Sequence, residues 1–150
     1  MAVSLSRGDR LLLVLVLALS GVAVAADLTA EWYHAANSSW CDVSSYFSCT
    51  RVRASAYAAV SGIPTAVVGI GGFGVLAVLS WTALRGRVRI GRWSIGQWIR
   101  LFSAIGAAIG LGLSLLEVFV IQAVCILCAV GFALDLAILA VGASLLRAET

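Results

Sequence analysis

Four long apolar stretches dominate the sequence and leave little room for a soluble fold. They run from about Leu11 to Ala26, Ile63 to Leu84, Ile99 to Ile121 and Ala123 to Leu146. A helix that crosses a bilayer needs about 20 mainly apolar residues, and the last three stretches reach that length. Of the 150 residues 62% are hydrophobic, and a chain this short cannot bury so much apolar surface within itself. We therefore predict one all-α integral membrane domain, a bundle of four transmembrane helices.

The first stretch is the shortest and has two interpretations. Arg7 and Arg10, the apolar run and Ala23-Val24-Ala25 are together typical of a cleaved secretory signal peptide. Alternatively the helix is retained and continues past Ala26, with aromatic residues at the membrane interface. With retention, the single domain 1–150 has helices at about 11–30, 63–84, 99–121 and 123–146, an outer loop or cap at about 31–62 and a basic loop at about 85–98.

The positions of the arginines predict the orientation. All ten basic residues are arginines, and only Arg51 and Arg53 lie in the loop between the first two stretches. The other eight would share one side of the membrane, and the positive-inside rule makes that side the cytoplasm. We expect a multi-pass protein of the plasma (inner) membrane with both termini cytoplasmic. The net charge of +3 is then explained by arginines that set the topology. We therefore expect the protein to contact membrane lipid and to bind no nucleic acid.

The four cysteines form two pairs in the sequence. Cys125 and Cys128 make a C-x-x-C at the outer start of the last helix, where the i, i+3 spacing puts both sulfurs on one face. In the first helical turn the free N–H groups would stabilise a thiolate on Cys125. Two ordinary buried cysteines or a metal site are the alternatives, although the spacing of the other pair suits tetrahedral zinc poorly.

Cys41 and Cys49 form the second pair, in the outer loop, with seven residues between them. That spacing lets the loop close into a disulfide or open again. Arg51 and Arg53 should favour a thiolate at Cys49, and Asp42 should oppose one at Cys41. A static structural disulfide is the alternative. Two pairs on the outer side, where disulfides persist, favour a redox relay.

One stretch resembles a known family. The pattern C-D-V-x-x-x-x-S-C-x-R-V-x-x-S, from Cys41 to Ser55, resembles the vitamin K epoxide reductase family. The C-x-x-C matches the quinone-side pair of that family, and the order of four helices agrees over nearly the whole chain. The resemblance implies a four-helix bundle around a quinone pocket, with the first helix retained. It also implies a quinone-dependent thiol–disulfide oxidoreductase that uses ubiquinone or menaquinone and no metal.

The resemblance also implies roles for the four cysteines. Cys128 would be the thiol next to the quinone, and Cys125 would exchange with Cys49. Cys41 and Cys49 would receive electrons from a secreted thioredoxin-fold (DsbA-like) partner, which must be a separate protein because no such domain is present here. The chain would thereby drive disulfide formation outside the cytoplasm.

Three further residues are expected at the quinone pocket on the same resemblance. Ser55 matches a Ser/Thr position close to the redox centre. Thr65 stands near a position where the family often has an Asn that hydrogen-bonds a quinone carbonyl, and Phe132 stands where the vitamin K enzymes have a Tyr. Both departures weigh against reduction of vitamin K epoxide and are compatible with quinone reduction. A non-enzymatic membrane scaffold with static disulfides is the remaining hypothesis.

Two acids lie inside the apolar stretches, Glu117 near the outer end of the third and Asp135 near the middle of the fourth. Charged groups are costly in a bilayer and face the bundle interior or a partner. They either deliver protons to the reduced quinone or are neutral, hydrogen-bonded groups that fix packing. Gly106, Gly110 and Ser114 form a small-xxx-small ladder, which is typical of close helix packing and alternatively of a cavity wall.

Overall fold

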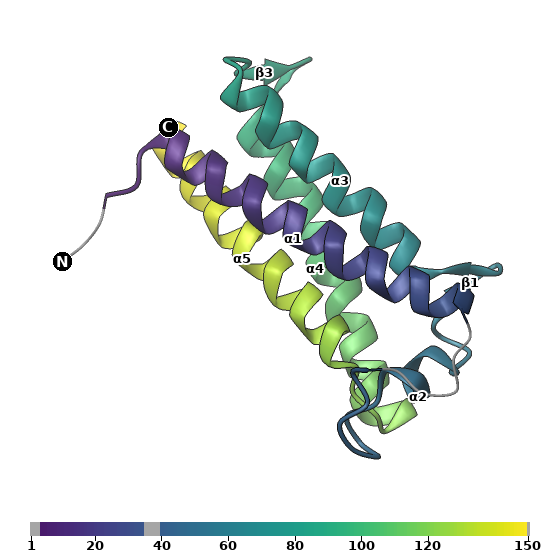
Figure 1. The fold of residues 1–150 in the computed structure, drawn as a ribbon. Coiled ribbons are helices and arrows are strands. Elements are labelled where there is room, and N and C mark those ends of the chain that lie inside the picture. The colour runs from purple at the N-terminus through teal and green to yellow at the C-terminus, as the bar shows by residue number, and fades with distance from the viewer. Residues whose placement is uncertain (1–3, 35–39, 150) are drawn as a thin grey trace.

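Four long helices lie side by side in the computed structural model, which describes residues 4–34 and 40–149 (Figure 1). They are α1 (Arg7–His34), α3 (Thr65–Leu84), α4 (Ile95–Leu116), which continues as the π-helix η1 (Glu117–Ile121), and α5 (Ile126–Glu149). Within the described ranges these are the helices long and apolar enough to cross a membrane. The predicted all-α membrane fold is confirmed.

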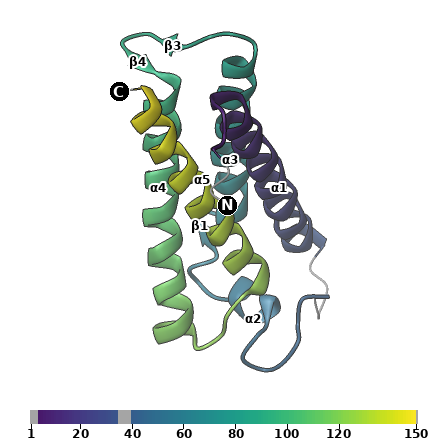
Figure 2. The ribbon, with the colours of Figure 1, turned by 90° about the vertical axis from the view of Figure 1, so that its left-hand side faces the viewer.

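The bundle has two different ends (Figures 1 and 2). One end carries residues 40–64, here called the cap, with the short helix α2 (Cys49–Arg53) and a hairpin of β1 (Ala59–Val60) and β2 (Ile63–Pro64). The other end, here called the basic end, carries the hairpin of β3 (Arg89–Ile90) and β4 (Trp93–Ser94). The start of α1 and the end of α5 also lie there.

The helix limits follow from local chemistry at their ends. α1 continues without a break past Ala26 to His34, and residues 35–39 of the predicted outer loop lie outside the described ranges. α4 begins at Ile95 because Ser94 and Gln97 form a capping box. The Gln97 N–H donates to Ser94 Oγ at 3.3 Å, and the Ser94 N–H donates to Gln97 Oε1 at 2.9 Å. Two free backbone donors are thereby satisfied.

The packing of α1 shows how the bundle divides its apolar surface. Its buried residues recur every three or four positions and form one stripe: Leu11, Val14, Ala18, Gly21 and Ala25. This stripe faces α3 and α5, which α1 contacts most extensively. Apolar residues on other faces are more than half exposed: Leu12, Val16 and Leu19. An apolar outer surface of this kind suits hydrocarbon as the surrounding solvent.

The buried side chains form two clusters at different heights of the bundle. The larger is aliphatic and joins all four long helices; its fully buried members include Val14, Ile95, Ile99, Ile138 and Leu145. The smaller lies where the cap meets the bundle and contains Cys41, Cys49, Val52, Ala123, Cys125 and Leu127. Three of the four cysteines therefore belong to the core of the capped end.

Candidate active site

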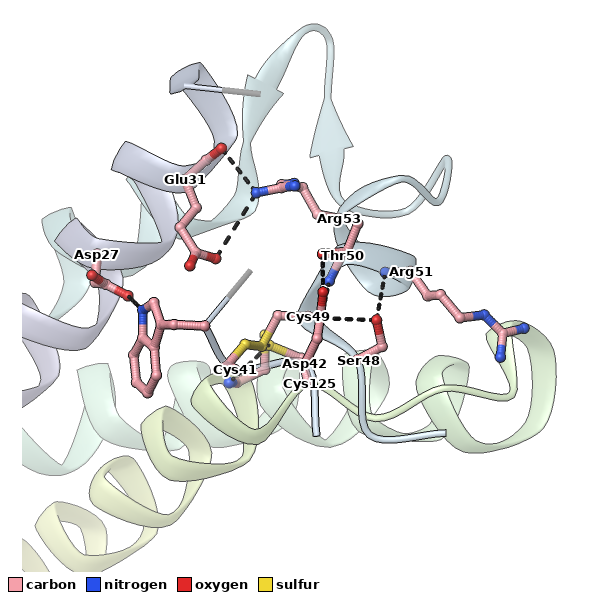
Figure 3. The surroundings of a disulfide bond; sticks show 12 residues. Asp27, Glu31, Cys41, Asp42, Ser48, Cys49, Thr50, Arg51, Arg53 and Cys125 are labelled. Carbon is pink, nitrogen blue, oxygen red and sulfur yellow. Dashed lines mark hydrogen bonds and ion pairs between the residues drawn. A yellow bond between two sulfur atoms is a disulfide. The ribbon is translucent and has the colours of Figure 1, made fainter. Parts of the chain in front are cut away.

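Three sulfur atoms meet under the cap (Figure 3). Cys41 and Cys49 are joined by a disulfide, and Cys49 Sγ lies 2.9 Å from Cys125 Sγ. Cys41, Cys49 and Cys125 are each at most 3% exposed. Cys125 and Cys128 are free thiols. The structure thus brings the two predicted pairs into contact, although Cys49 and Cys125 are far apart in the sequence.

Cys125 lies just before α5 rather than inside its first turn, which corrects the sequence-based expectation. α5 begins at Ile126, and the N–H of Cys128 donates to Cys125 Sγ at 3.4 Å. This is the arrangement of an N-cap residue, whose side chain accepts from the third helical residue while its own backbone is not helical. The sulfur therefore receives a free N–H from the helix end without being part of the helix.

The surroundings of Cys125 favour its thiolate. The Cys128 thiol hydrogen-bonds to Cys125 and lowers the pKa of the Cys125 thiol, and the N–H groups of Cys128 and Leu127 lower it further. Burial and the Glu117 carboxylate act in the opposite direction, and the net shift is downward. A thiol with a lowered pKa is a good leaving group in thiol–disulfide exchange. The residue in contact with the loop disulfide is thus the one suited to leave when that disulfide forms.

Asp42 holds the two halves of the loop pair together. Its carboxylate accepts hydrogen bonds from Ser48 Oγ (2.9 Å), the Thr50 N–H (3.1 Å) and Thr50 Oγ1 (2.6 Å). Ser48 in turn caps α2 by accepting from the Arg51 N–H at 3.2 Å. Since Asp42 follows Cys41 and the other groups flank Cys49, this network orients both cysteines. The carboxylate is directed at the start of α2, a role that the sequence analysis did not assign.

Two polar contacts tie the cap to α1 (Figure 3). Arg53 Nη1 donates to the Glu31 carbonyl at 2.9 Å and lies 3.9 Å from the Glu31 carboxylate. Trp40 Nε1 donates to Asp27 Oδ2 at 3.2 Å. The sequence analysis expected Arg53 to favour a thiolate at Cys49. In the structure its guanidinium group binds Glu31 of α1.

The segment before Cys125 is also bound to the cap. The Val124 N–H donates to the Tyr46 carbonyl at 2.8 Å, and Phe47 and Val124 form a parallel bridge. On the other side, the Cys125 N–H donates to Glu117 Oε2 at 3.1 Å. Glu117 is only 6% exposed and starts the π-helix, a feature frequent at functional sites. Cys125 is therefore fixed by two hydrogen bonds, one from its own N–H to the Glu117 carboxylate and one from the preceding N–H to the cap.

A cavity of about 770 Å³ opens beside the sulfurs. Residues of α1, α2, α3, α4 and α5 line it, and most of them are apolar. Cys49, Cys125 and Cys128 lie in its wall, together with Glu117 and Asp135. Both the volume and the apolar lining with a few polar groups are typical of small-molecule sites.

The three residues predicted at the quinone pocket all line this cavity. Ser55 Oγ donates to the Val52 carbonyl at 2.7 Å, and Thr65 Oγ1 donates to the Ala58 carbonyl at 3.1 Å. Each hydroxyl proton is therefore engaged within the cap, and the hydroxyl oxygens retain acceptor capacity. Phe132 offers only its ring.

The small-xxx-small ladder of α4 makes room for side chains of α5. A Cβ at Gly110 would lie 2.5 Å from Phe132 Cδ2, and one at Gly106 would lie 2.8 Å from Asp135 Oδ2. These distances are too short for any side chain to be tolerated without movement. Both glycines also line the cavity, so close packing and a cavity wall occur together.

The three sulfurs under the cap also lie within 4.8 Å of one another, as ligands of one metal ion would. Two of them are joined in the disulfide. A disulfide sulfur is no thiolate, and the thiolate is the form that binds metal. In this redox state the arrangement suits exchange between sulfurs.

Comparison with known proteins agrees with the geometry. The model of the vitamin K epoxide reductase family matches residues 12–143. This range contains all four long helices in large part, the cap and the four cysteines. Among curated proteins, no sequence matches the chain.

Proposed function

Since the chain belongs to the vitamin K epoxide reductase family, and is therefore a membrane oxidoreductase, we propose that it oxidises a thioredoxin-fold partner at the expense of a quinone. Electrons pass from the partner's dithiol to Cys41 and Cys49, then to Cys125 and Cys128, and then to the quinone, which leaves as quinol. The single observation that carries this proposal is the 2.9 Å contact between Cys49 Sγ and Cys125 Sγ.

The exchange between the pairs runs through one mixed disulfide. With Cys125 and Cys128 oxidised, the Cys49 thiolate attacks Cys125 Sγ and Cys128 leaves as the thiolate. Cys41 then attacks Cys49, and Cys125 leaves. The state with the Cys41–Cys49 disulfide and two free thiols is the product of this sequence. The lowered pKa of Cys125 favours the last step, because a more acidic thiol leaves faster.

Quinone reduction then restores the disulfide of α5. Cys128 lies in the wall of the 770 Å³ cavity, which has the size of a small-molecule site and an apolar lining suited to a quinone ring. The two thiols lose two electrons and two protons and form the Cys125–Cys128 disulfide. The quinone gains the same two electrons and two protons. Ser55, Thr65 and Phe132 shape the wall around the ring in this proposal.

The orientation belongs to the same proposal. The basic end carries the arginines of the β3–β4 hairpin and the start of α1, and the positive-inside rule assigns it to the cytoplasm of a plasma (inner) membrane. The cap and its sulfurs then face outward, where a secreted DsbA-like partner is available. Both termini are cytoplasmic in this arrangement.

Reduction of vitamin K epoxide and a static scaffold are less well supported. Phe132 offers no polar atom to an epoxide oxygen, and the Thr65 hydroxyl already donates to Ala58. A scaffold needs no contact between a disulfide and a third cysteine, whereas Cys49 and Cys125 touch.

The test uses the purified protein in lipid nanodiscs with a reduced thioredoxin-fold partner and a short-chain ubiquinone or menaquinone. We expect the quinone absorbance to fall as the partner is oxidised. The matched variant Cys128→Ser should lose quinone reduction, because the Cys125–Cys128 disulfide can no longer form, whereas Cys41→Ser should accumulate the Cys49–Cys125 mixed disulfide, because Cys41 is the thiol that resolves it. If no quinone is consumed with any thioredoxin-fold dithiol, the proposal is wrong. Thiol labelling in intact cells tests the orientation, and a pair that only a cytosolic reagent reaches would exclude it.

A further inference from the structure

Asp135 is a buried acid, and one of its carboxyl oxygens lacks a hydrogen-bond partner within the described part of the chain. The residue is 6% exposed, and its Oδ2 has no hydrogen-bond partner among the described residues. It also belongs to the wall of the cavity that Cys128 lines. Buried polar atoms are nearly always hydrogen-bonded, and an acid within a membrane helix usually faces a partner or a ligand. An acid without a partner on a cavity wall therefore points to a ligand in that cavity.

The position of Asp135 along α5 relates it to the redox centre. It follows Cys128 by seven residues, close to two full turns, so both residues lie on the same face of the helix at a separation of about 10.5 Å along its axis. Phe132 lies between them and presents its ring to the same cavity. That spacing accommodates a single quinone ring, with the thiol near one carbonyl group and the carboxyl group near the other.

Helix α4 sets the place of the carboxyl group. A Cβ at Gly106 would come within 2.8 Å of Asp135 Oδ2, so any side chain at Gly106 would displace the acid. Gly106 lines the cavity as well. The acid is thus held against a glycine that leaves it at the cavity surface.

We propose, on the basis of the proposed quinone reduction, that Asp135 donates a hydrogen bond to the quinone carbonyl farther from Cys128 and protonates that oxygen when the ring is reduced. The group must be the neutral acid, which has one O–H donor. An unpaired carboxylate at this depth in hydrocarbon would be costly.

The protons and electrons of this step balance. The thiols of Cys125 and Cys128 give up two electrons and two protons and become a disulfide, and the quinone takes up both. One thiol proton goes to the nearer carbonyl oxygen. The other oxygen takes the proton of Asp135, which the second thiol proton then replaces through the cavity, so that the acid ends the cycle neutral.

The test separates binding from proton transfer. Asp135→Asn keeps an N–H donor but has no acidic proton, whereas Asp135→Leu has neither. We expect Asp135→Asn to keep the quinone dissociation constant within about threefold and to slow single-turnover quinone reduction about 10²-fold, the size of a lost general acid. Asp135→Leu should in addition weaken binding about tenfold. Disulfide exchange between the cap pair and the thioredoxin-fold partner, measured without quinone, should not change.

Two controls guard against a purely structural effect. Ser80 Oγ is the other buried side-chain atom without a partner in the described ranges and does not line the cavity, so Ser80→Ala should reduce quinone at the wild-type rate. Gly106→Ala should slow the reaction by displacing the acid, while Gly112→Ala on the same helix, with no atom within 4 Å of its Cβ, should not.

The outcomes are distinct. If Asp135→Asn reduces quinone as fast as wild type, or if Ser80→Ala loses as much activity, the role of Asp135 is overturned while the proposed function stands. If the wild-type protein reduces no quinone while it still exchanges disulfides, the proposed function fails and this inference fails with it.

Discussion

The cap and the basic end lie at opposite ends of the same four helices and are held by different kinds of contact. The cap is held by contacts between groups distant in the sequence: Arg53 to Glu31, Trp40 to Asp27, and Val124 to Tyr46. The basic end relies mainly on local contacts.

At the basic end, Ser94 and Gln97 cap α4 within one turn, and the rings of Trp93 and Trp98 lie 5.1 Å apart. Arg10 Nη1, which donates to the Ser144 carbonyl at 2.8 Å, is a distant tie there.

This difference shows where precise geometry is needed. A helix end at the membrane surface requires only satisfied backbone groups, which residues close in sequence supply. Two cysteine pairs that exchange a disulfide must meet within van der Waals distance, and only long-range contacts can bring them there. The cap is therefore the region where mutations should affect activity more than stability.

The largest effect should come from the contact between the pairs. Cys125→Ser removes the sulfur that touches Cys49, and we expect disulfide transfer to the quinone to fall by at least about 10³-fold, as for loss of a nucleophile. The rate of quinone reduction with a reduced partner measures this loss, and the thermal unfolding midpoint measures any loss of stability. Because serine is nearly the same size, the midpoint should change little. A variant with substantial turnover would show that the sulfur contact is not the route.

The next largest effect should follow from loosening the cap. Asp42→Ala removes three hydrogen bonds, and a shift of about 1 Å at a reacting group costs on the order of 10²-fold in rate. We expect a loss of about 10- to 100-fold in the rate of exchange between the pairs, measured by trapping the redox states over time.

A matched control is Asp27→Asn, which changes another acid near the cap and keeps an acceptor for Trp40. This variant should stay within about threefold of wild type, because a weakened exposed contact is worth little. Equal losses in the two variants would contradict the special role of Asp42.

The ionisation of Cys125 gives a pH-dependent signature at the cap end. Its pKa is lowered, chiefly by the hydrogen bond from the Cys128 thiol, so the thiolate persists below the pH at which an ordinary cysteine is protonated and disappears as pH falls through the lowered value. Ultraviolet thiolate absorbance of the protein with an intact Cys41–Cys49 disulfide measures this, with Cys125→Ser as the blank. Cys128→Ala, which removes the side-chain donor, should move the transition to higher pH, and an unchanged transition would contradict the assigned cause.

A smaller effect is expected midway between the ends. A Cβ at Gly110 would lie 2.5 Å from Phe132, and overpacking of this kind costs about 1–3 kcal/mol. Gly110→Ala should therefore lower the thermal unfolding midpoint and raise the KM for quinone. Gly112→Ala, whose Cβ meets no atom within 4 Å, should do neither. The same result for both would mean that the ladder does not shape the cavity.

The smallest functional effect should come from the basic end. Ser94→Ala removes the N-cap of α4 and should cost about 1 kcal/mol of stability. Turnover at a temperature well below unfolding should equal that of wild type. A marked loss of turnover would erase the distinction between the two ends.

Much of the fold follows from the sequence. The length and composition of the apolar stretches predict helices, because a spanning segment must satisfy its own backbone hydrogen bonds. The helix ends are less predictable, since caps decide them: α4 begins four residues before the expected Ile99 because of Ser94 and Gln97. Likewise Cys125 caps α5 rather than entering it.

The candidate site is only partly predictable. The four cysteines and the two acids stand out because sulfur pairs and buried charges are rare in apolar segments. The bonds that Asp42 and Glu117 accept could not be predicted, since each carboxylate accepts from a backbone N–H eight residues further along the chain, across a turn. Such contacts depend on how the loop folds back on the bundle.

By itself the sequence determined that the chain is a membrane bundle with two cysteine pairs of a known family, because hydropathy, length and motif spacing are properties of the linear chain. Only the tertiary structure decided that Cys49 meets Cys125 and that the hydroxyl groups of Thr65 and Ser55 donate to carbonyl groups of the cap. It also decided that Asp135 lies on the cavity wall with no partner for its Oδ2 among the residues that the structure describes. Distances between residues on different elements depend on packing and on cap contacts, and these are not encoded in any single segment.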